Sequence, residues 1–585
     1  MLYPTLKRKS KKQQTVSAFR GYERRLRTNE GAFYDTENLS TAHYPLLSVR
    51  PRRGEVMALS APQGLAEKDA LAYIDGGTLY YNNTATPLTG MRAGEKQLVS
   101  MGAYLCIFPD KLYYNTQDAS DYGAMESEWS YEGQVEYAMC SLTGEEFGEA
   151  EAAPTAPDNP QEGDYWINTA SGTLSQYSVS MKMWVEVESV YTKLTFTTQG
   201  QLPTAFSQYD GVTLAGASIE SANGSKILHA VGGSPDTAPD FADAERDYII
   251  IAGEPLSAKK VVAGERVTIK RSVPDMDFVC QCANRLWGCR YGNDGGQNLN
   301  ELYCSALGDF KNWEQYMGLS TDSWRASVGS DGVFTGAVSY LGTPLFFKEN
   351  CIHRVSVSAT GAHQVGETAC RGVQKGSHKS LVVVNETLYY KSASDVCAYQ
   401  GAFPESVSTA LGSARYHDAV AGALGDNYYI SMLDEGNAAS LFVLDIAKGL
   451  WMREDDFRAT AFARVDNELY ALSGKTLYAM RGTVGAKEPP VKWRAETGML
   501  MCEYPRQKYL TRVLLRAWMD AESEAEVHVE YDSSGVWEYA GRMRLDEAGS
   551  AELPLRLRRC DHARIALSGR GDMRLISLTR EITEG

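Results

Sequence analysis

The sequence predicts an all-β protein: a β-propeller of about six or seven blades, an inserted β-module and a C-terminal β-sandwich-like module. Two observations predict this class. The 585 residues include 53 Gly, 34 Tyr, 16 Phe and 10 Trp, and glycine turns between aromatic segments are typical of β-structure. A turn followed by a Leu-Tyr pair also recurs along the chain. Because the chain is too long for one compact core, we expect several domains.

The Leu-Tyr repeat predicts the blades of the propeller. Its copies are DGGTLYYN (75–82), PDKLYYN (109–115), NLNELYCS (298–305), VNETLYYK (384–391), VDNELYAL (465–472) and SGKTLYAM (473–480). Each copy joins turn-forming residues to an alternating run, which indicates a β-hairpin. Tyr303, Tyr389 and Tyr470 lie 86 and 81 residues apart, about twice the 40–45 residues of a four-stranded blade. We assign residues 55–116 and 271–485 to the propeller.

Residues 117–270 interrupt this repeat and predict an insertion. Residues 117–165 contain 13 acids and no Lys or Arg, and their Pro- and Ala-rich end is typical of an acidic linker. The following GDYWINTASGTLSQYSVSMKMWVEV is a small aromatic β-motif that contains Trp166 and Trp184. Because exposed loop tips tolerate insertions, we expect a β-rich module inserted into a propeller loop.

The last module begins after Pro489 and Pro490. Residues 490–585 alternate between apolar and polar positions over about five segments, which predicts a β-sandwich-like module.

Residues 1–54 carry a charge opposite to the rest of the chain. They hold 12 Lys or Arg and four acids, a net charge of +8, which leaves −24 for the remainder of a chain whose formal charge is −16. The stretch GAFYDTENLSTAHYPLLSVRPRRG (31–54) has no helical or strand period, yet it contains aromatic and leucine side chains. We predict an extended assembly arm that orders when it docks on another subunit or protein; a solvated flexible terminus is the alternative. The expected contact residues are Lys7, Arg8, Lys9, Lys11, Lys12, Tyr34, Tyr44, Leu46, Arg50, Arg52 and Arg53.

Cysteine usage and hydropathy bear on the compartment. No signal peptide precedes the basic residues, and no run of about 18 apolar residues is present, so we expect no membrane insertion. The odd number of cysteines, 11, is typical of free thiols in a reducing compartment. Cys280, Cys282, Cys289 and Cys304 form a cluster whose spacing matches no zinc pattern well, so we expect small buried residues.

No specific catalytic motif is present in the sequence, and we expect neither an enzyme nor a cofactor or metal site. GNDGGQNLNE (292–301) offers Asn293, Asp294 and Glu301 to calcium but lacks the EF-hand spacing. YDSSGVWEY (531–539) contains parts of the Asp-box of sialidase propellers, with the wrong spacing and outside the propeller. The aromatic richness and the Trp166/Trp184 motif keep open an alternative function, a glycan-binding or glycan-cleaving propeller that recognises a host surface.

Four stretches together carry a resemblance to a known family. They are FYDTENLSTAHYPLLSVRPRRG (33–54), CANRLWGCRYGNDGGQNLNELYCSALGDFKNW (282–313), GVQKGSHKSLVVVNETLYYKSASDVCAYQGAFPESVS (372–408) and RLRRCDHARIALSGRGDMRLISLTRE (556–581). They resemble the tail nozzle, or tail hub and stabilisation, proteins of short-tailed bacteriophages. The resemblance does not extend to residues 117–270.

This resemblance implies a structural virion protein without catalytic residues. Such a β-propeller subunit assembles as a hexamer below the portal and adaptor rings, extends the channel through which DNA leaves, and offers surfaces to tail fibres and a plug protein. It implies assembly in the cytoplasm of a bacterial host and a final location in the virion tail. The net charge of −24 beyond residue 54 would suit a conduit that DNA passes without specific binding, because a basic lining would hold phosphates.

Overall fold

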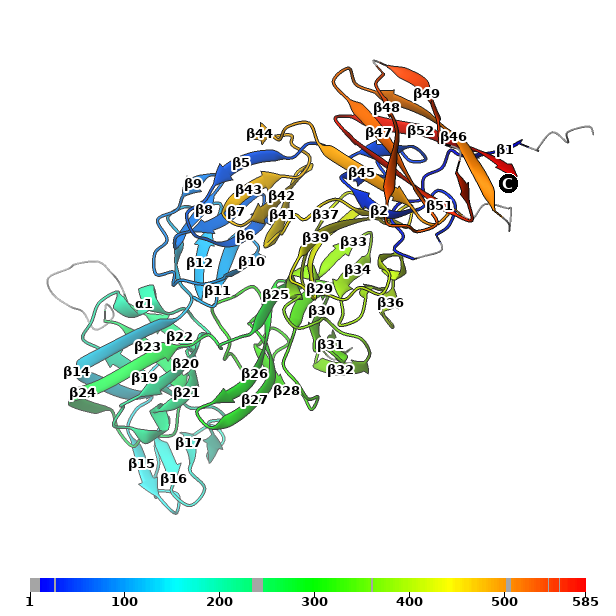
Figure 1. Ribbon diagram of the computed structural model, residues 1–585. Helices are drawn as coiled ribbons and strands as arrows, with labels where there is room; N and C mark the ends of the chain where they lie inside the picture. The colour runs from blue at the N-terminus through cyan, green and yellow to red at the C-terminus, as the bar shows by residue number, and fades with distance from the viewer. Residues whose placement is uncertain are drawn as a thin grey trace, which may run out of the picture.

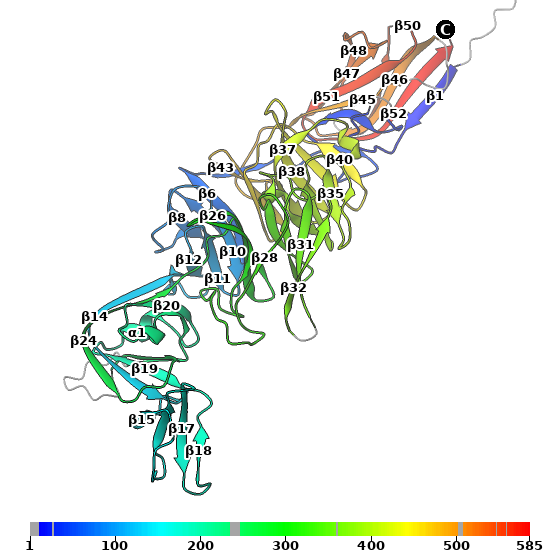
Figure 2. The same cartoon turned by 90° about the horizontal axis from the view of Figure 1, so that it is seen from below.

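The computed structural model describes residues 11–25, 28–233, 246–358, 361–500, 507–545, 547–556 and 558–584. These residues form many small antiparallel sheets and only short helical turns, so the predicted all-β class is confirmed. The molecule is elongated, with a β-sandwich at one end, a β-propeller in the middle and the inserted module at the other end (Figures 1 and 2). Both the first strand and the last strand lie in the sandwich (Figure 1).

The described residues form seven propeller blades, which resolves the predicted six or seven. Blade one contains β6 (Pro62–Lys68), β7 (Ala70–Asp75), β8 (Thr78–Tyr81) and β9 (Thr84–Ala85). Blade two contains β10 (Gln97–Met101), β11 (Tyr104–Phe108), β12 (Leu112–Asn115) and β13 (Tyr122–Ala124). Blade three contains β25 (Phe278–Cys282), β26 (Arg285–Asp294), β27 (Gln297–Cys304) and β28 (Trp324–Ser327). Blade four contains β29 (Gly336–Tyr340), β30 (Thr343–Phe347), β31 (Cys351–Val357) and β32 (His363–Ala369). Blade five contains β33 (Val382–Val384), β34 (Thr387–Lys391), β35 (Val396–Tyr399) and β36 (Glu405–Ser406). Blade six contains β37 (Tyr416–Leu424), β38 (Asn427–Asp434), β39 (Ala439–Asp445) and β40 (Leu450–Arg453).

The seventh blade is completed by a strand from the start of the chain. β41 (Ala461–Val465), β42 (Glu468–Ser473) and β43 (Thr476–Ala479) are followed in the sheet by β5 (Gly54–Ala58) and β44 (Ala486–Lys487). β41 contacts β6 of the first blade, which closes the ring. Because closure pairs two segments far apart in the chain, the sheet edges that an open array would expose are removed.

The Leu-Tyr pairs lie in the second or third strand of their blades, β8, β12, β27, β34, β42 and β43. Their side chains fill the space between or within blades. Leu388 and Tyr389, for example, are buried, and the Tyr389 ring lies 5.4 Å from the ring of Tyr428 in the next blade. The repeat therefore marks buried positions on the second or third strand of five of the seven described blades.

The inserted module leaves and re-enters the propeller through two paired strands. β14 (Ser127–Cys140) and β24 (Lys260–Arg271) run antiparallel from the register Ser127↔Arg271. They form a seven-stranded sheet with β19 (Tyr191–Phe196), β20 (Gly211–Ala215), β21 (Gly224–Ile227), β22 (Ala230–Gly232) and β23 (Tyr248–Ala252), beside which lies α1 (Gln201–Ala205). A smaller sheet contains β15 (Ala150–Ala153), β16 (Tyr165–Asn168), β17 (Thr173–Ser178) and β18 (Met183–Glu186), and it forms the far tip of the molecule (Figure 2).

Two details of the predicted insertion differ from the structure. β13 still belongs to the second blade, so the propeller continues past residue 116 to residue 124. The acidic stretch 117–165 is also not simply a linker, because all of β14 and all of β15 lie within it. Its carboxylates alternate with apolar residues such as Val135 and Tyr137, which are buried on the other face of β14.

The C-terminal sandwich contains strands from both ends of the chain. One sheet holds β45 (Lys492–Thr497), β47 (Glu524–Tyr531), β48 (Trp537–Met543) and β51 (Ala563–Arg570), with β2 (Phe33–Glu37) at its edge. The other holds β46 (Lys508–Met519), β49 (Ala548–Pro554), β50 (Arg559–Cys560) and β52 (Met573–Glu584), together with β1 (Lys11–Val16), β3 (Leu39–Ser40) and β4 (Leu47–Val49). A common core of aliphatic side chains lies between the sheets.

The predicted separate arm is therefore corrected for the described residues 11–25 and 28–54. β1 to β4 belong to the sandwich of their own chain, and β5, which begins at Gly54, belongs to the propeller. These strands have only two to six residues, too few to show a period. β3 pairs with the nearby β4, and the other strands have partners hundreds of residues away. Tertiary pairing decides their conformation.

Candidate functional site

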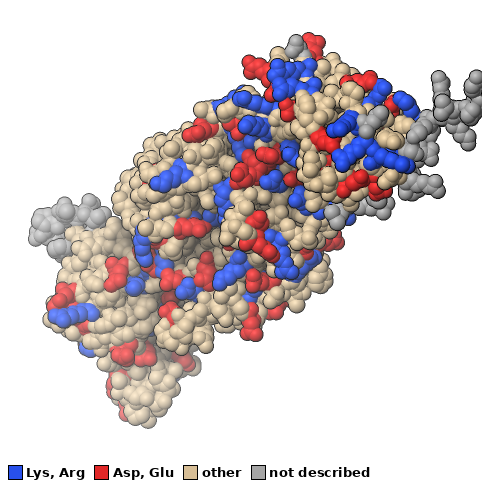
Figure 3. Space-filling model, viewed as in Figure 1, with Lys and Arg blue, Asp and Glu red and all other residues tan. Residues whose placement is uncertain are grey.

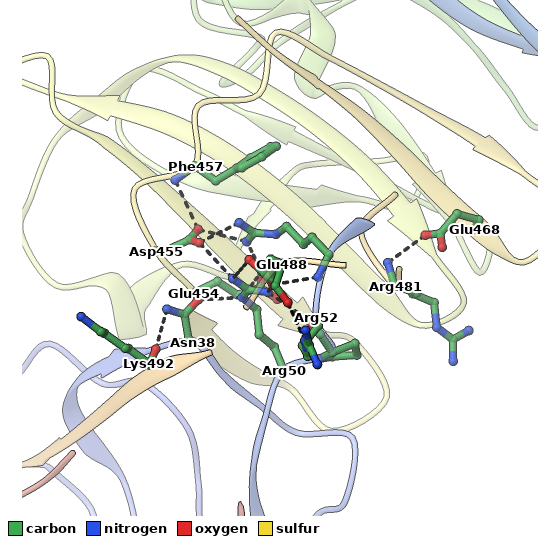
Figure 4. A network of polar contacts seen from close by, with 12 residues as sticks. Asn38, Arg50, Arg52, Glu454, Asp455, Phe457, Glu468, Arg481, Glu488 and Lys492 are labelled. Atoms are coloured by element: carbon green, nitrogen blue, oxygen red, sulfur yellow. Dashed lines mark hydrogen bonds and ion pairs between the residues drawn. The ribbon is translucent and has the colours of Figure 1, made fainter. Parts of the chain in front are cut away.

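The predicted assembly residues fall into three environments. Lys7, Arg8 and Lys9 lie outside the described residues. Lys11 and Lys12 lie on β1, where Lys11 Nζ is 3.1 Å from Glu581 Oε1. On the sandwich side Tyr34 stacks under two guanidinium groups, Tyr44 is exposed and Leu46 is half-buried. Arg50, Arg52 and Arg53 lie at the joint between sandwich and propeller (Figure 4).

Arg50 and Arg53 form the centre of this joint, although both are almost fully buried. Arg53 donates through two terminal nitrogens to Asp455 and Glu454, with N–O distances of 2.7 Å to each. Arg50 donates to Glu488 Oε1 at 2.5 Å, and its NH2 lies 3.4 Å from Asp455 Oδ2. The segment that leads from the sandwich to β5 is thereby tied to the loop after β40 and to the segment before β45 (Figure 4).

Further polar contacts continue the joint on both sides of the arginines. Arg50 Nε donates to Asn38 Oδ1 at 2.6 Å, and Asn38 Nδ2 donates to the carbonyl oxygen of Lys492 at 2.9 Å. Thr36 Oγ1 donates to the Arg453 carbonyl oxygen at 3.1 Å and accepts the Arg453 N–H at 3.0 Å. Buried polar groups that find partners in this way specify one arrangement of the two modules.

The electrostatics of the joint favour a charged Asp455. Burial raises the pKa of Asp455, but Arg53 and Arg50 outweigh this effect, and its pKa lies below the usual range. Burial also raises the pKa of Glu454, and the two arginines counteract that rise only in part. Two guanidinium groups and three carboxylates are therefore held together in a site from which water is largely excluded. Removal of one partner from such a site strongly lowers the free energy of unfolding, because it leaves a buried charge unpaired.

The partners of the arginines were missed in the sequence. Glu454, Asp455 and Glu488 were not singled out, because each is one of 74 acids. The signal that could have indicated them is the run Glu454, Asp455, Asp456 directly after an apolar strand that ends in Trp451 and Met452. Charged residues that directly follow a buried strand must either form ion pairs or remain exposed to solvent.

The propeller axis contains a second candidate site, a cavity of about 460 Å³ where the inner strands meet. Its lining is mostly apolar and includes Leu65, Val99, Val279 and Phe462, with no Asp or Glu among the lining residues. The pair of carboxylates that glycoside hydrolysis requires is therefore absent from the lining.

A polar bridge crosses the axis beside this cavity. Lys379 Nζ, from blade five, lies 2.6 Å from Glu95 Oε1, which precedes blade two, and 2.8 Å from the Thr460 carbonyl oxygen of blade seven. His378 Nε2 lies 3.8 Å from the same carboxylate, and burial lowers the pKa of His378. These contacts join segments of blades five and seven to the segment before blade two across the centre of the ring.

The cysteine cluster and Glu301, from the loop considered for calcium, make contacts within the propeller. Cys280, Cys282, Cys289 and Cys304 lie in an apolar core between blades three and four, and burial raises their thiol pKa values. Glu301 pairs with Arg325 and accepts a hydrogen bond from Tyr303 at 2.7 Å. Within the described ranges, no group of three or more His, Cys, Asp or Glu is arranged to hold a metal ion.

The tip of the insert carries the aromatic motif found in the sequence. The Trp166 and Trp184 rings lie 5.7 Å apart, and a cleft of about 370 Å³ beside them is lined by Tyr165, Trp184 and three carboxylates, Glu149, Glu151 and Asp164. The hairpin that ends this sheet exposes apolar side chains, among them Val179, Met181, Met183 and Val185. By contrast, Lys and Arg gather over the sandwich (Figure 3).

None of the described helices has the length and apolar character needed to cross a lipid bilayer. No protein-family model matches the chain, and no curated protein matches it.

Two solved structures align with the chain at low similarity. A glycoside hydrolase family 43 arabinoxylan arabinofuranohydrolase from Bacillus subtilis, in complex with cellotetraose, shares 9% identity over 52% of this chain and 94% of its own, with a TM-score of 0.19. A protein described as a glycoside hydrolase shares 9% identity over 95% and 99% of the two chains, with a TM-score of 0.16. Such low TM-scores support no conclusion about substrate or activity.

Proposed function

We propose that the chain is a structural subunit of a virion tail: a ring, hexameric by the family resemblance, that extends the DNA ejection channel below the portal and adaptor. The observation that carries this proposal is the joint of Arg50 and Arg53. It locks a sandwich made from both chain ends onto a closed propeller and so gives an elongated, stiff building block. A subunit of a closed ring needs such fixed angles between its contact surfaces, because the rotation at each interface has to close.

The bore of such a ring would lie between subunits and not along a propeller axis, since Glu95 and Lys379 bridge the centre of the propeller. DNA would then pass outer surfaces of a chain whose residues beyond 54 carry a net charge of −24. An acidic wall repels phosphates and lets DNA slide without specific binding.

The two ends of the molecule differ in charge and suit different partners. The basic segment Lys7–Lys9, just before β1, would contact the portal and adaptor, and the apolar and acidic tip of the insert would face the tail fibres or plug. The protein would be assembled in the cytoplasm of a bacterial host and then reside in the virion tail, without inserting into a membrane.

Native mass spectrometry of the purified chain, alone and with portal and adaptor proteins of a short-tailed phage, tests this proposal. We expect a closed ring that binds the adaptor. We also expect loss of that binding, with the ring retained, when Lys7, Arg8 and Lys9 are replaced by Ser. A chain that remains monomeric with and without these proteins would contradict the proposal.

The cleft at the insert tip favours a second candidate, a glycan-binding function. Sugar rings stack on exposed aromatic faces and donate hydroxyl groups to carboxylates, and Tyr165, Trp184 and Asp164 offer both kinds of group. Isothermal titration with host-surface oligosaccharides would show binding that Trp184→Ala abolishes. The control Tyr539→Ala alters an exposed aromatic residue of the sandwich and should leave it unchanged.

A further inference from the structure

A cluster of polar side chains on blade four takes no part in the joints between modules. Ser330 lies in the loop between β28 and β29, His353 lies on β31, and Glu367 lies on β32. Lys348 lies in the turn between β30 and β31. Titratable groups gathered around one serine are the pattern of a nucleophile and its base.

The order of the contacts is that of a catalytic triad. Ser330 Oγ lies 2.7 Å from His353 Nε2, and Glu367 Oε2 lies 3.9 Å from His353 Nδ1. The hydroxyl and the carboxylate therefore face opposite nitrogens of one ring. When the proton is on Nδ1, the lone pair of Nε2 accepts the hydrogen bond of the serine.

The β-sheet itself sets this geometry. His353 and Glu367 are directly opposite each other in the register of β31 and β32, and side chains at such positions share one face. His353 is 1% exposed, and its Nδ1 makes no hydrogen bond to any described residue. A buried polar atom without a hydrogen-bond partner destabilises the fold, so packing alone does not explain the position of Nδ1.

A buried ammonium group lies next to the serine. Lys348 is 2% exposed, and its Nζ donates to the Ser330 carbonyl oxygen at 2.7 Å and to Asn300 Oδ1 at 2.9 Å. Among the described residues, no Asp or Glu oxygen lies within 4.0 Å of this nitrogen. Its positive charge is therefore not neutralised by an ion pair and favours negative charge that develops beside Ser330.

The loop around the serine is accessible and offers further donors. Ser330 is half-buried, whereas Gly329, Asp331 and Gly332 are exposed. The backbone N–H groups of Ser330, Asp331 and Gly332 make no hydrogen bond to other described residues. Free N–H groups beside a nucleophile can receive the oxygen of a tetrahedral intermediate.

We propose that Ser330, His353 and Glu367 form an ester-hydrolysing site whose substrates are short acyl esters. Ser330 Oγ attacks the ester carbonyl carbon while His353 Nε2 takes the hydroxyl proton. The bond to the alcohol oxygen breaks, and the same proton passes to the leaving alcohol. Water, deprotonated by His353, then cleaves the acyl-serine to a carboxylic acid and restores Ser330. This activity is independent of the ring proposed above.

Cys351 is the competing nucleophile at this site. Its Sγ lies 3.7 Å from the same His353 Nε2, but the side chain is only 6% exposed and burial raises its thiol pKa. A buried neutral thiol reacts poorly, so the geometry assigns the reaction to Ser330.

Labelling of the full-length protein with a fluorophosphonate probe tests the proposal, because such probes modify activated serines. We expect the modified peptide to contain Ser330. We expect p-nitrophenyl acetate hydrolysis to fall at least about 100-fold in Ser330→Ala, and less in Glu367→Gln, whose side chain is half exposed. Ser356→Ala, at an exposed serine of β31, the strand that carries His353, is the matched control and should keep both signals.

Circular dichroism of each variant separates loss of activity from loss of fold. Labelling at Ser330, with hydrolysis lost in a folded Ser330→Ala, would support the site. Unmodified Ser330 in the folded protein, equal hydrolysis by Ser330→Ala, or alkylation of Cys351 by iodoacetamide that alone abolishes hydrolysis would overturn it.

Discussion

The propeller is joined to its two neighbours in different ways. The sandwich joint places two buried arginines, Arg50 and Arg53, among three carboxylates. At the insert joint, one buried ion pair, Arg271 NH1 to Asp210 Oδ2 at 2.5 Å, links two segments of the insert itself where it meets the propeller. Beside it, Asn312 of blade three bonds the backbone of the insert, accepting from Gly211 N at 3.0 Å.

The difference follows from how the chain passes through each joint. The insert leaves and returns along β14 and β24, which pair with each other, so the strands already fix its direction. The sandwich is reached by two separate crossings, one near Arg50 and one near Glu488, which are not paired over a long ladder. A network of charges holds these crossings together, and the sandwich joint is therefore the more sensitive to a single substitution.

Deletion of residues 1–27 should lower the stability of the protein more than a point substitution at either joint. It should destabilise the sandwich and leave the insert unaffected. It removes β1 from the edge of β52 and also removes Val16 and Phe19 from the sandwich core, each worth about 1.5–3 kcal/mol. Calorimetry should show the sandwich melting early in a separate transition. A single transition at the temperature of the intact chain would contradict the assignment of β1 to the sandwich.

Arg53→Met should have the second-largest effect on stability. It leaves Glu454 and Asp455 buried with half of their counter-charge, so we expect the free energy of unfolding to fall by about 3–5 kcal/mol in urea denaturation. Arg52→Ala is the matched control, because Arg52 Nε donates only to the Glu488 carbonyl oxygen and the residue is half-buried; we expect about 1 kcal/mol. Equal losses in the two variants would mean that the network does not hold the joint.

Asp210→Asn should have a smaller and local effect. It removes the negative charge that faces Arg271. A hydrogen bond to a charged group contributes about 1.5–3 kcal/mol to the free energy of unfolding. Hydrogen exchange should accelerate in β20 and β24 of the insert and stay unchanged in the sandwich strand β46. Faster exchange in both modules would show that the two joints are coupled.

Lowering the pH should destabilise the sandwich joint more than the insert joint, and this is the smallest of the expected effects. The pKa of Asp455 lies below its usual 3.8, so its contribution is complete above that value and is lost as the pH falls through the folded pKa. Burial raises the pKa of Asp210 against the pull of Arg271, so protonation of Asp210 is not penalised in the same way. Between pH 5 and 3, proteolysis should open the sandwich joint first, and Asp455→Asn should weaken this pH dependence.

The blades could be predicted from the sequence because each is local. A hairpin such as Thr387–Lys391 with Val396–Tyr399 contains its own turn, its own strands and the Leu-Tyr pair that packs between them. The blade number could not be read in the same way, since the last blade takes β5 from a segment more than 400 residues earlier. β1, β2 and β4 could not be predicted for the same reason, because they pair with β45 or β52 more than 400 residues later, and β3 pairs only with β4.

The candidate sites depend on register, and register is not visible in one sequence. His353 and Glu367 are 14 residues apart in the chain and become neighbours only because β31 and β32 pair in one particular alignment. Arg50, Arg52 and Arg53 were singled out by their charge, and the sequence indicated contacts for them. It could not indicate that the partners of Arg53 are Glu454 and Asp455 of the same chain.

Cryo-electron microscopy of the purified full-length chain tests the proposed function most directly. We predict closed rings in which each subunit keeps its sandwich and its insert at opposite ends, with the bore between propellers and no density for an open channel along a propeller axis. Dispersed monomers at every concentration, or rings whose subunits bend freely at the Arg53 joint, would contradict a stiff ring-forming subunit.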